Sequence, residues 1–247
     1  MSLNVVITMA GRGSRFYDAG YKIPKYEIMA HERSLFEWSM LSLKNFLTPD
    51  SRVIFVCLEE NKSSDFVLRQ TKALGLTDVH IIELKELTDG QATSAYLSRE
   101  LWNPEWPLLI YNIDTYVKPH AIKPADIRPG SDGWVPCFQV PGEHWSFVKL
   151  GDDGWAVDLA EKQRISHHAS IGLYWFSRAG RYVVLYDRFF GDPKNLVGGE
   201  KYIAPLYRQL LAEGGKVSLS DLRPSDVHVL GTPAEFDRFL QLPVGEL

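Results

Sequence analysis

Cysteine is scarce in this chain of 247 residues, which contains only Cys57 and Cys137. Neither belongs to a closely spaced group of the kind that binds zinc or carries out redox chemistry. We therefore predict that both are small buried side chains in a reducing compartment. A chain of this length buries enough surface to fold without disulfides or a structural metal.

An excess of charge of one sign is also absent. The chain has 27 Lys and Arg residues against 31 Asp and Glu residues, a formal net charge of −4. A slightly acidic chain has no general attraction for nucleic acid or for an anionic membrane surface. The first ten residues contain a short apolar run without a basic leader, so we expect no membrane span and a cytoplasmic location. An anionic ligand would have to be held by a local basic cluster.

The sequence does contain a regular alternation of strand-like and helix-like segments. Four apolar runs are separated by stretches of helical length: Leu3–Met9, Arg52–Leu58, Val79–Leu84 and Pro107–Ile113. Strands that alternate with helices pair in parallel, whereas the shorter runs after residue 114, separated by Pro and Gly, predict antiparallel strands. We predict an α/β fold, a single Rossmann-like three-layer domain over residues 1–247. Its sheet would be mixed and mostly parallel, with a small antiparallel insert.

Local signals predict further elements. Ser34 and Glu37 form a capping box ahead of an apolar pattern, which is typical of the start of an amphipathic helix. Another helix is predicted over Glu200–Ala212. The tryptophans, Trp145 among them, are predicted to pack in the core and the hairpins, because they show no interleaving with basic residues.

A glycine-rich loop, Ala10–Arg15, follows the first predicted strand. Glycine at positions 11 and 13 lets the backbone approach a ligand closely, so that its N–H groups can point at phosphate oxygens. The loop is neither a Walker motif nor a dinucleotide-binding fingerprint. Its surroundings are basic, with a single acid, Asp18, near Arg12, Arg15, Lys22 and Lys25. The loop is therefore predicted to bind an anion, with a plain solvated turn as the alternative.

Two polar residues follow apolar strands at the edge where open α/β sheets bind ligands. Asp114 ends the fourth predicted strand. Mg²⁺ prefers one or two carboxylates together with substrate phosphates, so Asp114 is the predicted metal ligand, and a turn or helix-cap role is the alternative. Gln91 opens a helix among small residues, and its amide can read a nucleotide base. The alternative there is ordinary capping by Thr88 or Asp89.

The Gly-Arg-Gly-Ser-Arg-Phe loop and the Pro-Lys pair at residues 24 and 25 resemble the signature of the sugar-phosphate nucleotidyltransferases. These include nucleoside-diphosphate-sugar pyrophosphorylases that supply capsule and surface-polysaccharide precursors. The resemblance implies that a nucleoside triphosphate transfers its nucleoside monophosphate to a small phosphorylated acceptor, such as a sugar 1-phosphate, releasing pyrophosphate. It also implies Mg²⁺ as cofactor, Arg15 at the departing pyrophosphate and Lys25 beside the reacting phosphorus. The sequence leaves open whether the chain forms a homo-oligomer.

Later motifs follow the order of the family. Glu161 and Lys162 resemble its Glu-Lys-Pro motif, in which Lys meets the acceptor phosphate and Glu a sugar hydroxyl, although Gln163 replaces the Pro. Gly172 resembles a strand glycine that lets the acceptor approach, and Glu200 a later acidic position. The implied residues are Arg15, Lys25, Asp114 and Lys162 for catalysis; Ala10, Gly11, Arg12, Gly13, Ser14 and Gln91 for the nucleotide; and Glu161, Gly172 and Glu200 for the acceptor.

One departure from the family concerns the metal. Members commonly carry a second metal-binding Asp two residues before the Gly of Gly-Thr-Pro, and here that position is Val229. Asp226 or Asp221 could replace it, or the metal could rest on Asp114 and phosphates alone. Two other functions stay open: a nucleotide-sugar-dependent glycosyltransferase, although Asn112 breaks the Asp-x-Asp pair it would need, and a catalytically silent nucleotide-binding protein, which Val229 favours.

Overall fold

Residues 2–247, the part of the chain that the structure describes, form fourteen strands and seven α-helices in the computed structural model. The strands are β1 (Leu3–Thr8), β2 (Met29–Ala30), β3 (Arg33–Ser34), β4 (Ser51–Leu58), β5 (Asp78–Leu84), β6 (Leu108–Asn112), β7 (Thr115–Val117), β8 (Gly133–Phe138), β9 (Ser146–Leu150), β10 (Ala156–Glu161), β11 (His168–Ser170), β12 (Leu173–Phe176), β13 (Val217–Leu222) and β14 (Val227–Val229). The helices are α1 (Ser14–Asp18), α2 (Leu35–Ser42), α3 (Ser64–Ala73), α4 (Gln91–Tyr96), α5 (Ala179–Phe189), α6 (Leu206–Ala212) and α7 (Pro233–Leu240).

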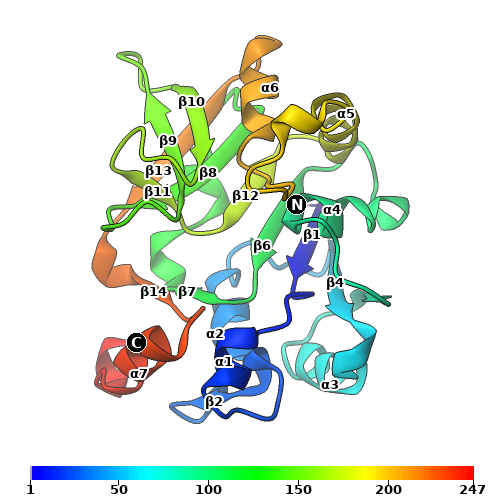
Figure 1. Ribbon diagram of the computed structural model, residues 1–247, viewed down its shortest axis with the longest axis vertical. Coiled ribbons are helices and arrows are strands. Elements are labelled where there is room, and N and C mark those ends of the chain that lie inside the picture. Colours follow the sequence, from blue (N-terminus) through cyan, green and yellow to red (C-terminus); the bar gives the residue numbers. More distant parts are fainter. Residues whose placement is uncertain (1) are drawn as a thin grey trace.

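One large mixed sheet organises the chain (Figure 1). Its strand order is β10-β9-β11-β8-β12-β6-β1-β4-β5, and β13 pairs with β8 in parallel. The segment β6-β1-β4-β5 is parallel throughout, while β12 joins β6 in the antiparallel sense. Two small sheets, β2-β3 and β7-β14, lie outside it. The predicted α/β class with a mixed sheet and antiparallel strands is confirmed.

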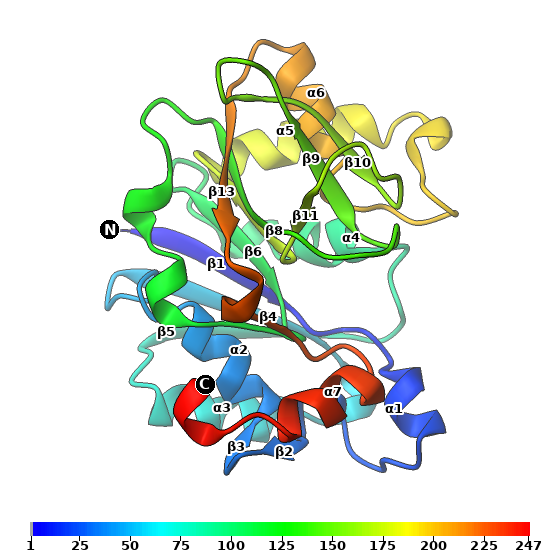
Figure 2. The ribbon, with the colours of Figure 1, turned by 90° about the vertical axis from the view of Figure 1, so that its left-hand side faces the viewer.

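Helices cover both faces of the sheet (Figure 2). On one face, α2 and α3 bury Phe36, Met40 and Val67 against the strands. On the other face, α4, α5 and α6 contribute a separate core that includes Tyr182 and Tyr207. These apolar side chains lie on the sheet-facing side of each helix, so burying them produces the three-layer arrangement.

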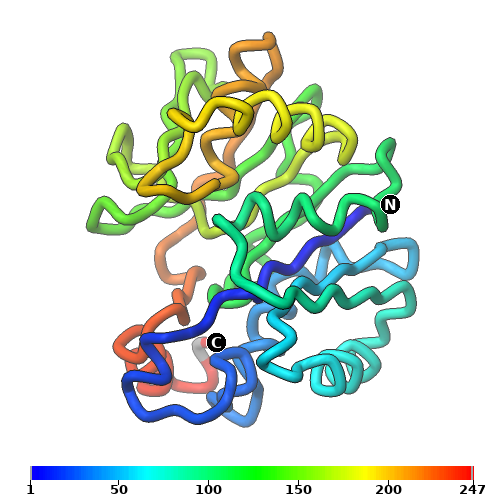
Figure 3. Tube along the Cα trace, turned by 45° about the vertical axis from the view of Figure 1, so that its right-hand side comes forward, coloured from blue at the N-terminus to red at the C-terminus, as the bar shows by residue number. Residues whose placement is uncertain are grey.

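The C-terminal helix packs beside the first helix (Figure 3). Phe236 of α7 lies 6.2 Å, ring centre to ring centre, from Phe16 of α1, and Phe239 contacts Trp38 of α2. These rings belong to a third apolar cluster. The cluster brings residues from the two ends of the chain to the same side of the sheet.

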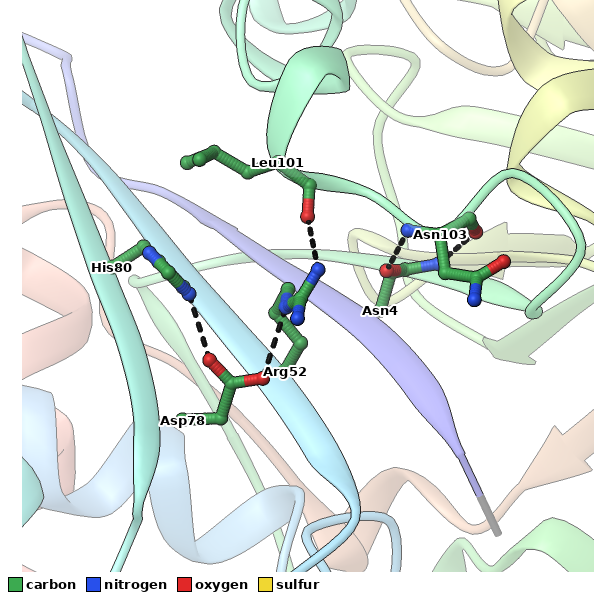
Figure 4. A network of polar contacts seen from close by, with 6 residues as sticks. All are labelled: Asn4, Arg52, Asp78, His80, Leu101 and Asn103. Carbon is green, nitrogen blue, oxygen red and sulfur yellow. Dashed lines mark hydrogen bonds and ion pairs between the residues drawn. The ribbon is translucent and has the colours of Figure 1, made fainter.

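A polar network holds the amino ends of the parallel strands (Figure 4). Arg52 donates to Asp78 at 2.9 Å and to the Leu101 carbonyl at 2.8 Å. Asn4 exchanges hydrogen bonds with the backbone of Asn103. Because these contacts lie at the starts of β1, β4 and β5, the opposite edge, where the strands end, is left for a ligand.

One predicted helix differs from the structure in its extent. The helix expected over Glu200–Ala212 begins only at Leu206, and Pro205 is its N-cap residue. Residues 200–204 precede the helix and are not part of it. Gly172, with φ of +81°, lies between β11 and β12. Among residues 2–247, none of the helices has the length and apolar character that a membrane span requires.

Candidate functional site

Two adjoining cavities lie where the parallel strands end. The first, here called the loop cavity, has a volume of about 270 Å³ and is lined by Ala10 and Gly11 of the glycine-rich loop. The second, the hairpin cavity, has a volume of about 260 Å³ and is lined by the facing ends of β9 and β10. Gln91, Asn112 and Asp114 line both cavities. The two cavities therefore adjoin one another at these three side chains.

Lys25 and Asp114 meet at the junction of the cavities. The Lys25 ammonium lies 2.6 Å from Asp114 Oδ2, and their side chains are 16% and 27% exposed. Lys25 begins a 3₁₀ turn directly after Pro24, and Asp114 follows β6. Arg15 of α1 lines the hairpin cavity together with Asp114. Two cationic side chains from the start of the chain thus converge on a mid-chain carboxylate.

The glycine-rich loop owes its shape to Gly13. This residue has φ of +64° and precedes α1, so it turns the chain in a conformation that glycine adopts without strain. A Cβ there would lie 3.8 Å from Lys25 Cβ, which places the turn directly against the lysine. The turn therefore packs the loop against the residue that pairs with Asp114.

The segment before α4 forms the other wall of the loop cavity. Gln91 Nε2 donates to Thr8 Oγ1 at 3.0 Å, which ties the start of α4 to the end of β1. The backbone of Lys201 holds this segment at both ends. Its N–H donates to the Asp89 carbonyl, and its own carbonyl accepts from Ala92 N. Both ends of the turn are held, so the Gln91 amide has a fixed place at the cavity.

Glu161, the last residue of β10, brings a carboxyl group to the hairpin cavity. The Ser146 hydroxyl donates to it and also contacts the Tyr174 hydroxyl at 2.8 Å. Burial raises the pKa of the Glu161 carboxyl above its ordinary value, although the Ser146 hydrogen bond opposes the shift. A buried carboxylate with few donors has acceptor capacity left for ligand hydroxyl groups.

Replacing Glu161 by glutamine is expected to raise the thermal unfolding midpoint at pH 8 and to leave it unchanged near pH 4. The raised pKa in the folded state means that this group stabilises the protein when protonated, and that the stabilisation is lost as the pH rises through the folded pKa. Thermal unfolding across this pH range measures the effect. The exposed Glu86→Gln is the control, with no expected change. A lower midpoint for Glu161→Gln at pH 8 would contradict the cause given for the pKa shift.

The oxygen donors near Asp114 fit a hard divalent cation. Within residues 2–247, no group of three or more His, Cys, Asp or Glu side chains is placed to hold a metal ion. Asn112 Oδ1, however, is buried without a hydrogen-bond partner in the described part of the chain, and Asn112 lines both cavities with Asp114. Mg²⁺ binds oxygen ligands and usually takes one or two carboxylates plus substrate phosphates, so this sparse donor set suits it.

Comparison with known proteins identifies the family. A scan of protein-family models and a search of curated proteins give no match. Among solved structures, the nucleoside-diphosphate-sugar pyrophosphorylase from Vibrio cholerae RC9 is 32% identical, with a TM-score of 0.87 over 96% of this chain and 100% of that chain. The chain belongs to the nucleoside-diphosphate-sugar pyrophosphorylase family. The inositol-1-phosphate CTP transferase from T. maritima shares the fold, with a TM-score of 0.75 and 16% identity over 96% of this chain and 94% of that one.

The predicted nucleotide residues divide into two groups by position. Ala10, Gly11 and Gln91 line the loop cavity, and Gly13 packs on Lys25. Arg12 and Ser14 instead line a separate hollow next to Glu60, and Arg12 Nε lies 3.9 Å from the Glu60 carboxylate. These two residues therefore do not line the loop cavity, and their predicted role in nucleotide binding stays a prediction.

The predicted acceptor residues also differ in position. Glu161 and Gly172 line the hairpin cavity, but Lys162 and Glu200 are not among its described lining residues. Lys162 Nζ instead contacts the Tyr202 hydroxyl and lies 3.8 Å from Glu200, and Tyr202 itself lines the cavity. Lys162 has φ of +54°, a left-handed turn that carries its side chain toward Tyr202. Lys162 and Glu200 therefore both contact Tyr202, which is part of the cavity wall.

Val229 stands where members of the family commonly carry a second metal-binding Asp. It lines the hairpin cavity. Neither proposed substitute replaces it. Asp226 is buried in ion pairs with Arg223 at 2.9 Å and His120 at 3.4 Å, and Asp221 lies 3.6 Å from His168. Neither carboxylate lines the loop cavity or the hairpin cavity.

Several residues that line the hairpin cavity are not predicted as site residues from the sequence. Trp145 was predicted to serve hairpin packing, yet it lines the cavity, as do His144 and Tyr202. Glu235 also lines it, and its sequence signal is the Thr-Pro-Ala-Glu segment that starts α7. That signal predicts a helix start and does not predict that Glu235 lines the same cavity as Asp114.

Proposed function

We propose that this chain transfers a nucleoside monophosphate from a nucleoside triphosphate to a small phosphorylated acceptor, a sugar 1-phosphate, and releases pyrophosphate. The observation that carries the proposal is the ion pair of Lys25 and Asp114 at the junction of two cavities, one beside a glycine-rich loop and one beside a polar hairpin. Membership of the pyrophosphorylase family supports this assignment.

The loop cavity would hold the nucleotide. Backbone N–H groups at Ala10 and Gly11 would face the phosphates, and the Gln91 amide would face the base. The hairpin cavity would hold the acceptor, with Glu161 accepting hydrogen bonds from its hydroxyl groups. The two substrates then meet beside Asp114.

In the reaction, an oxygen of the acceptor phosphate forms a bond to the α-phosphorus. The bond from that phosphorus to the oxygen that bridges it to the β-phosphorus breaks, and the electron pair leaves with pyrophosphate. The acceptor phosphate is already anionic, so the protein needs no general base. Lys25 and Arg15 would neutralise the charge that develops, and the cavity walls would align the reacting groups.

Asp114, with the Asn112 carbonyl oxygen nearby, would hold Mg²⁺. The bound ion would neutralise phosphate charge and help to orient the α-phosphate. The resemblance to precursor enzymes of capsule and surface polysaccharide supports a cytoplasmic role in activating sugars for those polymers.

Pyrophosphate release across a panel of nucleoside triphosphates and phosphorylated acceptors tests this function. We expect one triphosphate and one acceptor class to give pyrophosphate and an equal amount of nucleotide-linked acceptor. Nucleoside diphosphate release from nucleotide sugars would indicate a glycosyltransferase instead. Nucleotide binding without turnover of any pair would indicate a silent nucleotide-binding protein.

A further inference from the structure

Glu161 and Ser146 lie opposite each other at the hairpin cavity. Glu161 ends β10, Ser146 begins β9, and the two residues are direct partners in the antiparallel pairing of these strands. Directly opposed residues place their side chains on the same face of a sheet. The Ser146 hydroxyl donates to Glu161 Oε2, and among residues 2–247 no side chain donates to the other oxygen, Oε1. One carboxylate oxygen is therefore held, and the other is left for a ligand.

The hydrogen bond between Ser146 and Tyr174 has a fixed direction. The Tyr174 hydroxyl lies 2.8 Å from Ser146 Oγ. A serine hydroxyl has one proton, and Ser146 gives this proton to the Glu161 carboxylate, which can only accept. Burial raises the pKa of the Tyr174 hydroxyl, so this group stays protonated and able to donate. The three groups therefore form a hydrogen-bond relay that runs from Tyr174 through Ser146 to Glu161.

Both donors of the relay are buried. Ser146 is 9% exposed and Tyr174 is 4% exposed, and both line the hairpin cavity with Glu161. Tyr174 belongs to β12, which is not a neighbour of β9 in the sheet, so the contact joins two separate strands. A buried hydrogen bond is costly to break, because water does not replace the lost partner. The relay therefore restrains the Glu161 carboxylate at the cavity.

The relay also affects the ionisation of Glu161. Burial raises the pKa of this carboxyl, and the Ser146 hydrogen bond lowers it. Of the two charged neighbours, Lys162 lowers the pKa and Glu200 raises it, so their effects oppose each other. The other titratable residues that line the cavity are Arg15, Asp114, His144, Tyr174, Tyr202 and Glu235. The Ser146 donor thus favours the ionised form of Glu161, which is the stronger hydrogen-bond acceptor.

We propose that Ser146 and Tyr174 are positioning residues for the phosphorylated acceptor, because their relay holds Glu161 so that Oε1 can accept from a hydroxyl or amino group of that acceptor. This inference rests on the proposed function, in which the hairpin cavity binds the acceptor. Both residues act through Glu161, so their loss weakens acceptor binding and spares the transfer step. The relay thus favours acceptors that carry a hydrogen-bond donor in addition to the phosphate.

The first test needs no substrate. In protein labelled with ¹³C at the glutamate carboxyl groups, a pH titration followed by nuclear magnetic resonance reports the pKa of Glu161, and Glu161→Gln identifies its signal. We expect Ser146→Ala to raise this pKa, because the variant removes a donor to the ionised form. Ser146→Thr keeps the hydroxyl and is expected to keep the pKa of the unchanged chain.

Ser218→Ala is the matched control. Ser218 is 2% exposed, and its hydroxyl lies 2.7 Å from the Ser131 hydroxyl. It does not line the loop cavity or the hairpin cavity. This variant therefore also removes a buried, hydrogen-bonded hydroxyl, and we expect it to leave both the pKa of Glu161 and the KM for the acceptor unchanged.

The second test is kinetic and uses the sugar 1-phosphate that gives pyrophosphate fastest in the panel. Ser146→Ala is expected to raise KM for this acceptor about tenfold, with kcat within about twofold of the unchanged chain. The acid limb of kcat/KM should move to higher pH, since it follows the pKa of Glu161. Tyr174→Phe should raise KM about threefold, and it should add little in the Ser146→Ala background because Tyr174 acts through Ser146.

An unchanged pKa of Glu161 in Ser146→Ala would overturn the inference, and so would an unchanged acceptor KM or independent, additive losses in the double variant. Each of these results could occur in a protein that still releases pyrophosphate, so the proposed function would stand. Failure of the proposed function has a different signature. Every substrate pair would then give no pyrophosphate, while the titration of Glu161 would still confirm the relay.

Discussion

Replacing Asp114 by alanine is expected to lower turnover in the pyrophosphate-release assay by on the order of 10²-fold or more, with the fold retained. Asp114 lines both cavities and pairs with Lys25 at 2.6 Å, so its loss removes the proposed metal ligand and the partner that orients the lysine. The rate constant under saturating substrates is the quantity to measure.

Lys25→Ala is expected to cause a loss of similar size, and the double variant to be little worse than either single variant. Residues that act as one unit lose their joint contribution when either is removed. Asp152→Ala, at an exposed turn, is the matched control and should leave turnover unchanged. Turnover of Asp114→Ala within about threefold of that control would contradict the catalytic role, since one preorganised electrostatic contact is worth about 10²-fold.

Gly90→Ala is expected to lower the free energy of unfolding by about 3 kcal/mol or more, because it combines backbone strain with a collision. Gly90 has φ of +138°, and a Cβ there would lie 2.3 Å from the carbonyl oxygen of Lys201. Relief would require the segment before α4 to separate from residue 201, which would open the loop cavity. Chemical denaturation measures the loss of stability, and nucleotide affinity should fall with it.

Gly130→Ala is the matched control for the collision. Gly130 also has a positive φ, +83°, but no atom lies within 4 Å of the position that its Cβ would take. We expect this variant to cost only about 1–2 kcal/mol, the strain of a left-handed residue. Equal destabilisation by the two variants would contradict the close packing of Gly90 against Lys201.

The fold was predictable where local sequence carries the information. Apolar runs located β1, β4, β5 and β6, and the capping box at Ser34 and Glu37 located the start of α2. Glycine, basic residues and a strand-end Asp also sufficed to nominate Lys25 and Asp114. These signals depend on neighbours in sequence or on the shared edge of parallel strands, and both can be recognised without coordinates.

The rest depends on contacts between distant parts of the chain. The parallel pairing of β13 with β8 and the packing of Lys201 on Gly90 leave no periodic pattern in the sequence. The place of Glu235 beside Asp114 is set by a backbone hydrogen bond from Leu230. The local pattern of Glu235 predicts only a helix start and not its place in the cavity.

The position of a bound triphosphate tests the central claim most directly. A crystal structure with a non-hydrolysable analogue of the triphosphate chosen by the assay would reveal it. We predict phosphates in the loop cavity, between the backbone at Gly11 and the side chains of Lys25 and Asp114. Phosphates bound instead in the hollow beside Arg12 and Ser14, away from Lys25, would contradict the account.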